Sequence, residues 1–90
     1  MEDLEKIILR TLLRHNKIGE NYTKIQHATS KVPNSTKSAD IKKAIKNLRN
    51  AGWIELHKKN TCISLTGNRG RIEEIKKLIG FTRSLFSLLF

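Results

Sequence analysis

The sequence has 90 residues, which is enough for one domain and too few for two. Its hydrophobic fraction of 38% and charged fraction of 29% exclude a disordered chain, and its single cysteine, Cys62, excludes an internal disulfide. Lys and Arg outnumber Asp and Glu by 18 to 8. The resulting net charge of +10 favours a polyanionic partner, either nucleic acid or an anionic membrane surface, although a basic composition can also serve solubility alone.

Residues 3–15 are expected to form an amphipathic helix that ends at Asn16 and Gly19. One apolar stripe follows the spacing of a helix face, and its members are Leu4, Ile7, Ile8, Thr11 and Leu12. Leu9 and Leu13 form a second stripe beside the first. The apolar face is therefore wider than one small core needs.

A second, shorter helix is expected to begin at Thr23 and to end near Ser30. Gln26 follows Thr23 by three residues, which is the spacing of a capping box. Pro33 disfavours a helical conformation in the residue before it, so the helix cannot continue far beyond Ser30. Tyr22, just before this helix, is interpreted as a staple that packs against it, with a hydrogen bond to phosphate as the alternative.

The third helix is expected to run from Thr36 or Ser38 to Ala51, after a polar stretch rich in turn and cap residues. Its buried stripe consists of Ile41, Ala44, Ile45 and Leu48. Its other faces carry Lys42, Lys43, Lys46 and Arg49. Gly52 is expected to cap the end of the helix.

Two short strands with alternating polarity are expected next, at residues 53–57 and 62–65, joined by a tight basic turn at residues 58–60. Trp53, at the start of the first strand, is expected to pack against a helix. Thr66 is expected to cap a fourth helix at residues 68–79, whose inward positions are Ile72, Ile75, Leu78 and Ile79. Gly80 ends this helix, and the apolar tail at residues 81–90 is expected to be helical.

The order helix, helix, helix, hairpin, helix is that of a winged helix domain, and two stretches carry a family resemblance. Residues 48–54, Leu-Arg-Asn-Ala-Gly-Trp-Ile, resemble the end of the recognition helix and the start of the wing in winged helix-turn-helix transcription regulators of archaea and bacteria. Residues 63–72, Ile-Ser-Leu-Thr-Gly-Asn-Arg-Gly-Arg-Ile, resemble the strand-to-helix stretch after the wing. The resemblance implies a mostly helical α+β fold, with a winged helix-turn-helix domain at residues 1–80 and a separate tail at residues 81–90.

The resemblance further implies double-stranded DNA binding and a role in transcription regulation, through a recognition helix at residues 36–51 and a wing at residues 53–65. Between residues 31 and 59, eight Lys and Arg side chains accompany only two carboxylates, Asp40 and Glu55. Lysine suits phosphate better than base edges, so we expect strong backbone contact and modest base discrimination. The predicted DNA-binding residues are Thr36, Lys37, Ser38, Ala39, Lys42, Lys43, Lys46, Arg49, Lys58 and Lys59.

Two other functions stay open at this point. Winged helices also serve as protein-interaction modules, which an acidic or apolar recognition face would favour, and attraction to phosphate does not distinguish RNA from DNA. We expect no enzymatic activity, because no catalytic triad, paired carboxylate motif or phosphate-binding loop is visible. We also expect no metal and no cofactor, since three scattered histidines and Cys62 fall short of a zinc ligand set.

Three features bear on the location of the protein. The acidic N-terminus lacks the basic segment and cleavage site of a signal peptide, and no apolar run approaches the roughly 20 residues that span a bilayer. A single cysteine suits a reducing compartment. We therefore expect a cytoplasmic protein.

The surplus of apolar side chains at both ends of the chain predicts a homodimer. The expected interface consists of Leu9, Leu13, Phe81, Leu85, Phe86, Leu88, Leu89 and Phe90. Three alternatives remain for the tail: it folds back on the first helix of its own chain, docks another protein, or anchors the protein weakly to a membrane surface. At ten residues the tail is too short to span a bilayer.

Overall fold

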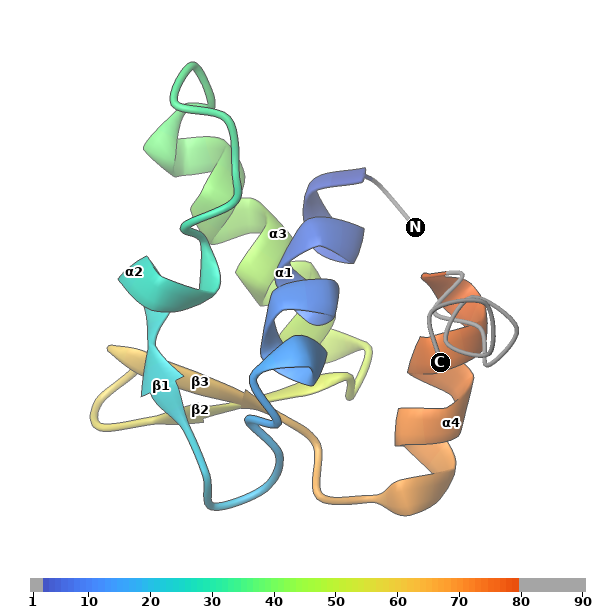
Figure 1. Ribbon diagram of the computed structural model, residues 1–90. Helices are drawn as coiled ribbons and strands as arrows, with labels where there is room; N and C mark the ends of the chain where they lie inside the picture. Colours follow the sequence, from blue (N-terminus) through green and yellow to red (C-terminus); the bar gives the residue numbers. More distant parts are fainter. Residues whose placement is uncertain (1–2, 80–90) are drawn as a thin grey trace.

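Seven elements follow one another along the chain in the computed structural model, which describes residues 3–79 (Figure 1). They are α1 (Asp3–Arg14), β1 (Thr23–Lys24), α2 (Ile25–Ala28), α3 (Ser38–Asn50), β2 (Ile54–His57), β3 (Cys62–Leu65) and α4 (Arg69–Leu78). About half of the described residues are helical and the strands form one antiparallel sheet, which confirms the predicted α+β class. The predicted tail contacts Phe81, Leu85, Phe86, Leu88, Leu89 and Phe90 lie outside the described residues.

α1 and α3 end in the same backbone motif, which fixes where each helix stops. After α1, Asn16 has a positive φ of 55°, and the N–H of the next residue donates to the carbonyl of Leu12 at 2.9 Å. After α3, Gly52 has a φ of 81°, and the following N–H donates to the carbonyl of Leu48 at 3.0 Å. This is the Schellman arrangement, which satisfies carbonyls of the last helical turn. It turns the chain sharply out of each helix.

The sheet has the strand order β1-β3-β2, so β3 is its central strand. Thr23 of β1 pairs with Ile63 of β3, and Ile54 of β2 pairs with Leu65 of β3. Every residue of β3 is buried, whereas its sequence predicts alternation between a buried and an exposed face. Ile63 and Leu65 belong to the hydrophobic core, and the Gly19 carbonyl and the His57 ring contact Ser64 on the opposite face.

The segment around β1 differs from the prediction. Thr23 and Lys24 form an edge strand, and α2 starts only at Ile25, whose N–H donates to the carbonyl of Thr61 at 3.2 Å. The predicted capping box is wrong, because Lys24 is the N-cap of α2 and no side chain caps this helix. The Thr23 hydroxyl lies 3.4 Å from Nδ1 of His27. Pairing with β3 thus outweighs the local preference of Thr23 for a helix cap.

Ser64 places a polar side chain in the middle of the central strand. It has no exposed surface, and its hydroxyl donates to the carbonyl of Gly19 at 2.7 Å. The same hydroxyl lies 3.0 Å from Nε2 of His57 in β2. A buried hydroxyl is tolerated because it has hydrogen-bond partners. Ser64 therefore joins the loop before β1 to the far strand of the sheet.

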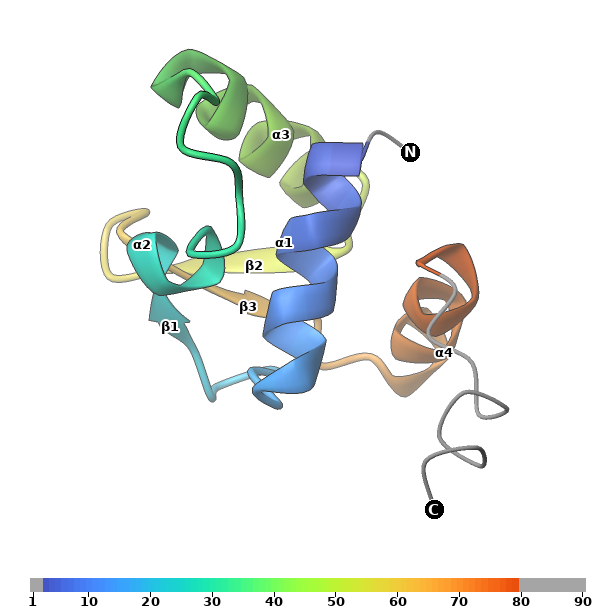
Figure 2. The same ribbon diagram turned by 45° about the horizontal axis from the view of Figure 1, so that its top comes forward.

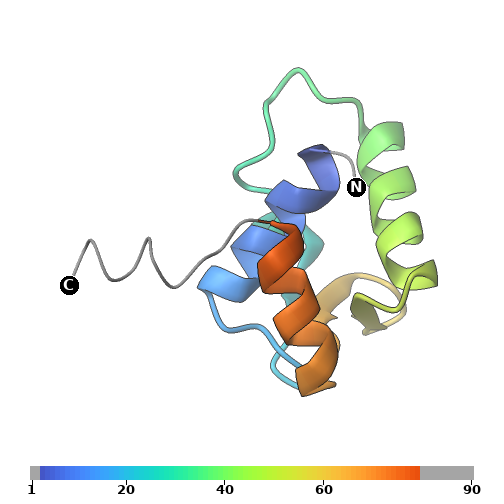
Figure 3. The ribbon, with the colours of Figure 1, turned by 90° about the vertical axis from the view of Figure 1, so that its right-hand side faces the viewer.

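α4 packs beside α1 and closes one side of the core (Figures 1 and 3). Leu9 has 0% exposure and belongs to the same buried cluster as three residues of this C-terminal region, Ile72, Ile75 and Ile79. The Arg10 guanidinium donates to the Ile79 carbonyl at 3.1 Å across the same contact. The prediction that Leu9 lies in a dimer interface is therefore wrong in this fold, because the protomer itself covers that side chain.

Two further predictions for α4 are corrected. Leu78, predicted to point inward, has 43% of its surface exposed. The N-cap is Asn68 and not Thr66, since the Asn68 side chain accepts from the N–H of Gly70 at 2.9 Å. Trp53 packs against this helix as predicted, because the guanidinium of Arg71 lies over its ring at 4.8 Å from the centroid. Along residues 3–79, no helix combines the length and the apolar character that crossing a bilayer requires.

Candidate nucleic-acid interface

The outer face of α3 is built by the same spacing that buries its inner face. Ala44, Ile45 and Leu48 point into the core. At about 100° per residue, the stripe diametrically opposite consists of Ala39, Lys43, Lys46 and Asn50, and all four are exposed. Figure 3 shows α3 at the right-hand edge of the molecule, with α1 in the middle. No other described element covers this stripe.

Two more cations flank the outer stripe on one side. Lys42 and Arg49 lie about 60–90° around the helix from its centre, and both are exposed. We call Lys42, Lys43, Lys46 and Arg49 the basic face of α3. The fold thus brings together all four of the predicted contacts from the body of this helix. Asn50, which the sequence reasoning missed, shares the outer stripe and could have been found from its spacing of seven residues after Lys43.

The start of α3 presents the remaining predicted helix contacts. Ser38 is the first helical residue, and Lys37 is an N-cap without a side-chain hydrogen bond. Ser38 and Ala39 are exposed, whereas Thr36 is half-buried in the preceding turn. Uncapped N–H groups at the start of a helix suit a phosphate oxygen. This end of α3 therefore matches the predicted contact region, with Thr36 less accessible than the others.

The β2–β3 hairpin carries two further cations at its tip. Lys58 and Lys59 are exposed, and the Thr61 N–H closes the turn on the Lys58 carbonyl at 3.2 Å. The two central residues of this turn, Lys59 and Asn60, have positive φ angles of 55° and 68°, as in a type I′ turn. Figure 2 shows the tip at the left, below the N-terminal end of α3.

Tyr22 and His57 form the aromatic base of the hairpin. The two rings stack with centroids 4.6 Å apart and an angle of 21° between their planes. Nζ of Lys58 lies over the Tyr22 ring at 5.9 Å from its centroid. The predicted staple thus has a different role, since Tyr22 supports the hairpin. Lys58 thus contacts this aromatic pair, and Lys59 is exposed beside it.

No ion pair within the described chain involves the cations of this surface, and Asp40 adds one exposed carboxylate in the first turn of α3. The ion pairs among residues 3–79 join Arg71 to Glu74 at 3.6 Å and Lys76 to Glu73 at 3.4 Å, and both lie on α4. The Glu55 carboxylate, the nearest acidic group along β2, accepts from the Gly67 N–H at 2.9 Å. No described carboxylate therefore pairs with the basic face of α3 or with the hairpin tip.

Comparisons with known proteins yield no relative: no family model, no curated protein and no solved structure matches the chain. Within the described residues, no three His, Cys, Asp or Glu side chains gather as a metal site would require. The candidate site is therefore a surface defined by its charge and shape.

Proposed function

We propose that the chain is a winged helix-turn-helix protein that binds double-stranded DNA, with α3 in the major groove and the β2–β3 hairpin on the flanking backbone. The observation that carries the proposal is the unpaired basic face of α3 beside a second cationic projection. An α-helix with its side chains is about 10–12 Å wide, and the major groove is about 12 Å wide. The order of the elements and of the strands is compatible with this fold.

The chemistry of the basic face favours phosphate contact over base reading. Three of its four cations are lysines, which act as point charges, and only Arg49 has the bidentate fork that reads guanine. Asn50 on the outer stripe can read adenine through its amide. We therefore propose a cytoplasmic, non-enzymatic regulator or chromosome-associated protein with limited sequence discrimination.

Pairing of two copies is the second part of the proposal. Leu13 is half-buried against the core and Leu78 is exposed, so the described surface keeps a modest apolar area near the point where the tail begins. The tail adds apolar residues in sequence. A two-fold dimer would present two copies of α3 to half-sites about 34 Å apart.

A salt-titrated binding assay tests the DNA proposal. Fluorescence anisotropy of the full chain is measured with duplex DNA, duplex RNA and single-stranded DNA over a series of salt concentrations. With four to six lysines on phosphates, log affinity for duplex DNA should fall by about four to five units per tenfold rise in salt. A flat salt response would remove the proposal, and tighter binding to duplex RNA would reassign it to RNA.

A further inference from the structure

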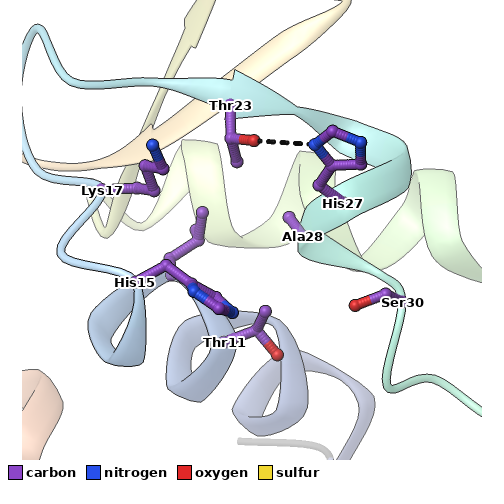
Figure 4. Close-up of a pocket in the computed structure, with 8 residues that line it drawn as sticks. Thr11, His15, Lys17, Thr23, His27, Ala28 and Ser30 are labelled. Atoms are coloured by element: carbon purple, nitrogen blue, oxygen red, sulfur yellow. Dashed lines mark hydrogen bonds between the residues drawn. The ribbon is translucent and has the colours of Figure 1, made fainter.

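A cavity of about 350 Å³ lies between α1, β1 and α2, away from the basic face of α3 (Figure 4). Leu12 and Ala28 lie beneath it with no exposed surface, so the residues above them form the wall that a ligand can reach. Thr11 of α1 and His15, in the turn after α1, line one side, and the β1–α2 segment forms the opposite wall in Figure 4. No residue of α3 or α4 lines it.

Among the described residues, the rim of this cavity carries one ammonium group, two imidazoles and hydroxyl groups without a carboxylate. Lys17, His15 and His27 line it together with the hydroxyls of Thr23 and Ser30, and no Asp or Glu does. His27 uses Nδ1 in its 3.4 Å contact with Thr23, which leaves Nε2 available as a donor or acceptor. Among residues 3–79, the side chains of Lys17 and His15 make no hydrogen bond or ion pair.

The helix dipole does not cancel this positive character. The C-terminal end of α1 borders the cavity and would by itself repel an anion. However, the carbonyls of Thr11, Leu12 and Leu13 each accept a backbone N–H from the turn that follows α1. The partial negative charge at that helix end is thereby reduced, and the Lys17 ammonium is left as the strongest charge at the rim.

We propose that this cavity binds a small anion, with its carboxylate or phosphate group held by Lys17, His15 and His27. The proposal does not depend on DNA binding. Ligand pockets commonly enclose about 300–1,000 Å³ and combine apolar walls with a few convergent polar groups. A cavity at the lower end of that range fits a compact molecule better than a nucleic-acid strand or a peptide.

Nuclear magnetic resonance on the full chain can test this site, with benzoate and inorganic phosphate as separate probes. Saturable shifts of backbone amides around the cavity are expected with either probe, because both present an anionic oxygen to Lys17. Lys17→Gln keeps the backbone contacts of that residue and should weaken binding about fivefold, the factor expected for one partly exposed charge pair. Lys42→Gln removes the same charge from α3 and should leave the affinity unchanged.

Three results would overturn the proposal. The first is that neither probe gives saturable shifts at the cavity. The second is that shifts of equal size spread over the lysines of α3, which would indicate general screening of charge. The third is that Lys17→Gln and Lys42→Gln have the same effect. The spectra themselves show whether each variant is folded, so loss of binding cannot be confused with loss of structure.

Discussion

Removal of Lys43 and Lys46 together is the sharpest test of the proposed docking face. Both side chains lie on the outer stripe of α3, both are exposed, and neither has a carboxylate partner within the described chain. Alanine has a helix propensity at least as high as lysine, so Lys43→Ala/Lys46→Ala should leave α3 helical. The thermal midpoint of unfolding should therefore stay unchanged while the affinity for DNA falls.

The size of the effect follows from counterion release. Each lysine on a phosphate contributes about 0.9 to the slope of log affinity against log salt, so the double variant should lower that slope by about 1.8. If the electrostatic contribution vanishes near 1 M salt, the loss at 0.1 M salt is about 1.8 log units, or about 60-fold. The affinities of the double variant and of the unchanged protein for DNA should converge as the salt concentration rises.

The matched control removes two lysines from the opposite part of the molecule. Lys76 and Lys77 lie on α4, and Lys76 pairs with Glu73 at 3.4 Å. Lys76→Ala/Lys77→Ala lowers the net charge by the same amount and should change the affinity only through the long-range field. Equal losses from the two double variants, measured by anisotropy at 0.1 M salt, would refute the assignment of α3 as the docking face.

Three further predictions concern the core and the assembly. Leu9→Ala should lower the free energy of unfolding by about 2–5 kcal/mol, because the side chain is fully buried. Leu78→Ala should lower it by less than about 1 kcal/mol. Equal losses in urea denaturation would contradict the assignment of Leu9 to the protomer core. Ser64→Ala should cost about 1–3 kcal/mol in the same assay, because it leaves a buried carbonyl and the His57 imidazole without a partner, and an unchanged midpoint would refute this role. The full chain should sediment as a dimer and a chain ending at Gly80 as a monomer; a monomeric full chain would exclude pairing, and a dimeric truncated chain would place the interface outside the tail.

The long helices and the hairpin could be predicted because their signals are local. The core stripes of α1 and α3 repeat over three turns, and Asn16 and Gly52 stand where each helix ends. β1 has only two residues, which is too short for any periodicity to show. It exists because the exposed edge of β3 offers Thr23 and Lys24 a partner, and that partner lies almost forty residues further along the chain.

Burial was harder to predict than the elements themselves. The spacing of Leu9 and Leu13 correctly indicates a wide apolar face on α1, but it does not reveal which element covers that face. The core of the protomer covers Leu9, whereas Leu78 of α4 stays exposed. Ser64 is hard to predict as buried for a similar reason, because the Gly19 carbonyl that its hydroxyl contacts belongs to a distant part of the sequence.

The candidate site was predictable in its positions and not in its charge balance. Helical spacing alone places Lys43 and Lys46 opposite the core stripe. It cannot show that the Glu55 carboxylate is held by the Gly67 N–H, or that the ion pairs of residues 3–79 are confined to α4. Those facts depend on tertiary contacts, and they leave the basic face without an ion-pair partner among residues 3–79.

In the turn of the β2–β3 hairpin, the residue types that favour stability differ from those that supply positive charge. Lys58, Lys59 and Asn60 have successive positive φ angles of 51°, 55° and 68°. This conformation costs a lysine about 1–2 kcal/mol, a cost that glycine largely avoids. Selection for heat resistance alone would therefore replace Lys59 by glycine, and selection for affinity to a polyanion would keep it. Adaptation to heat therefore sets stability against positive charge at the tip of the hairpin. On the outer face of α3, substitutions can change the charge without a backbone cost, because its lysines have ordinary helical conformation.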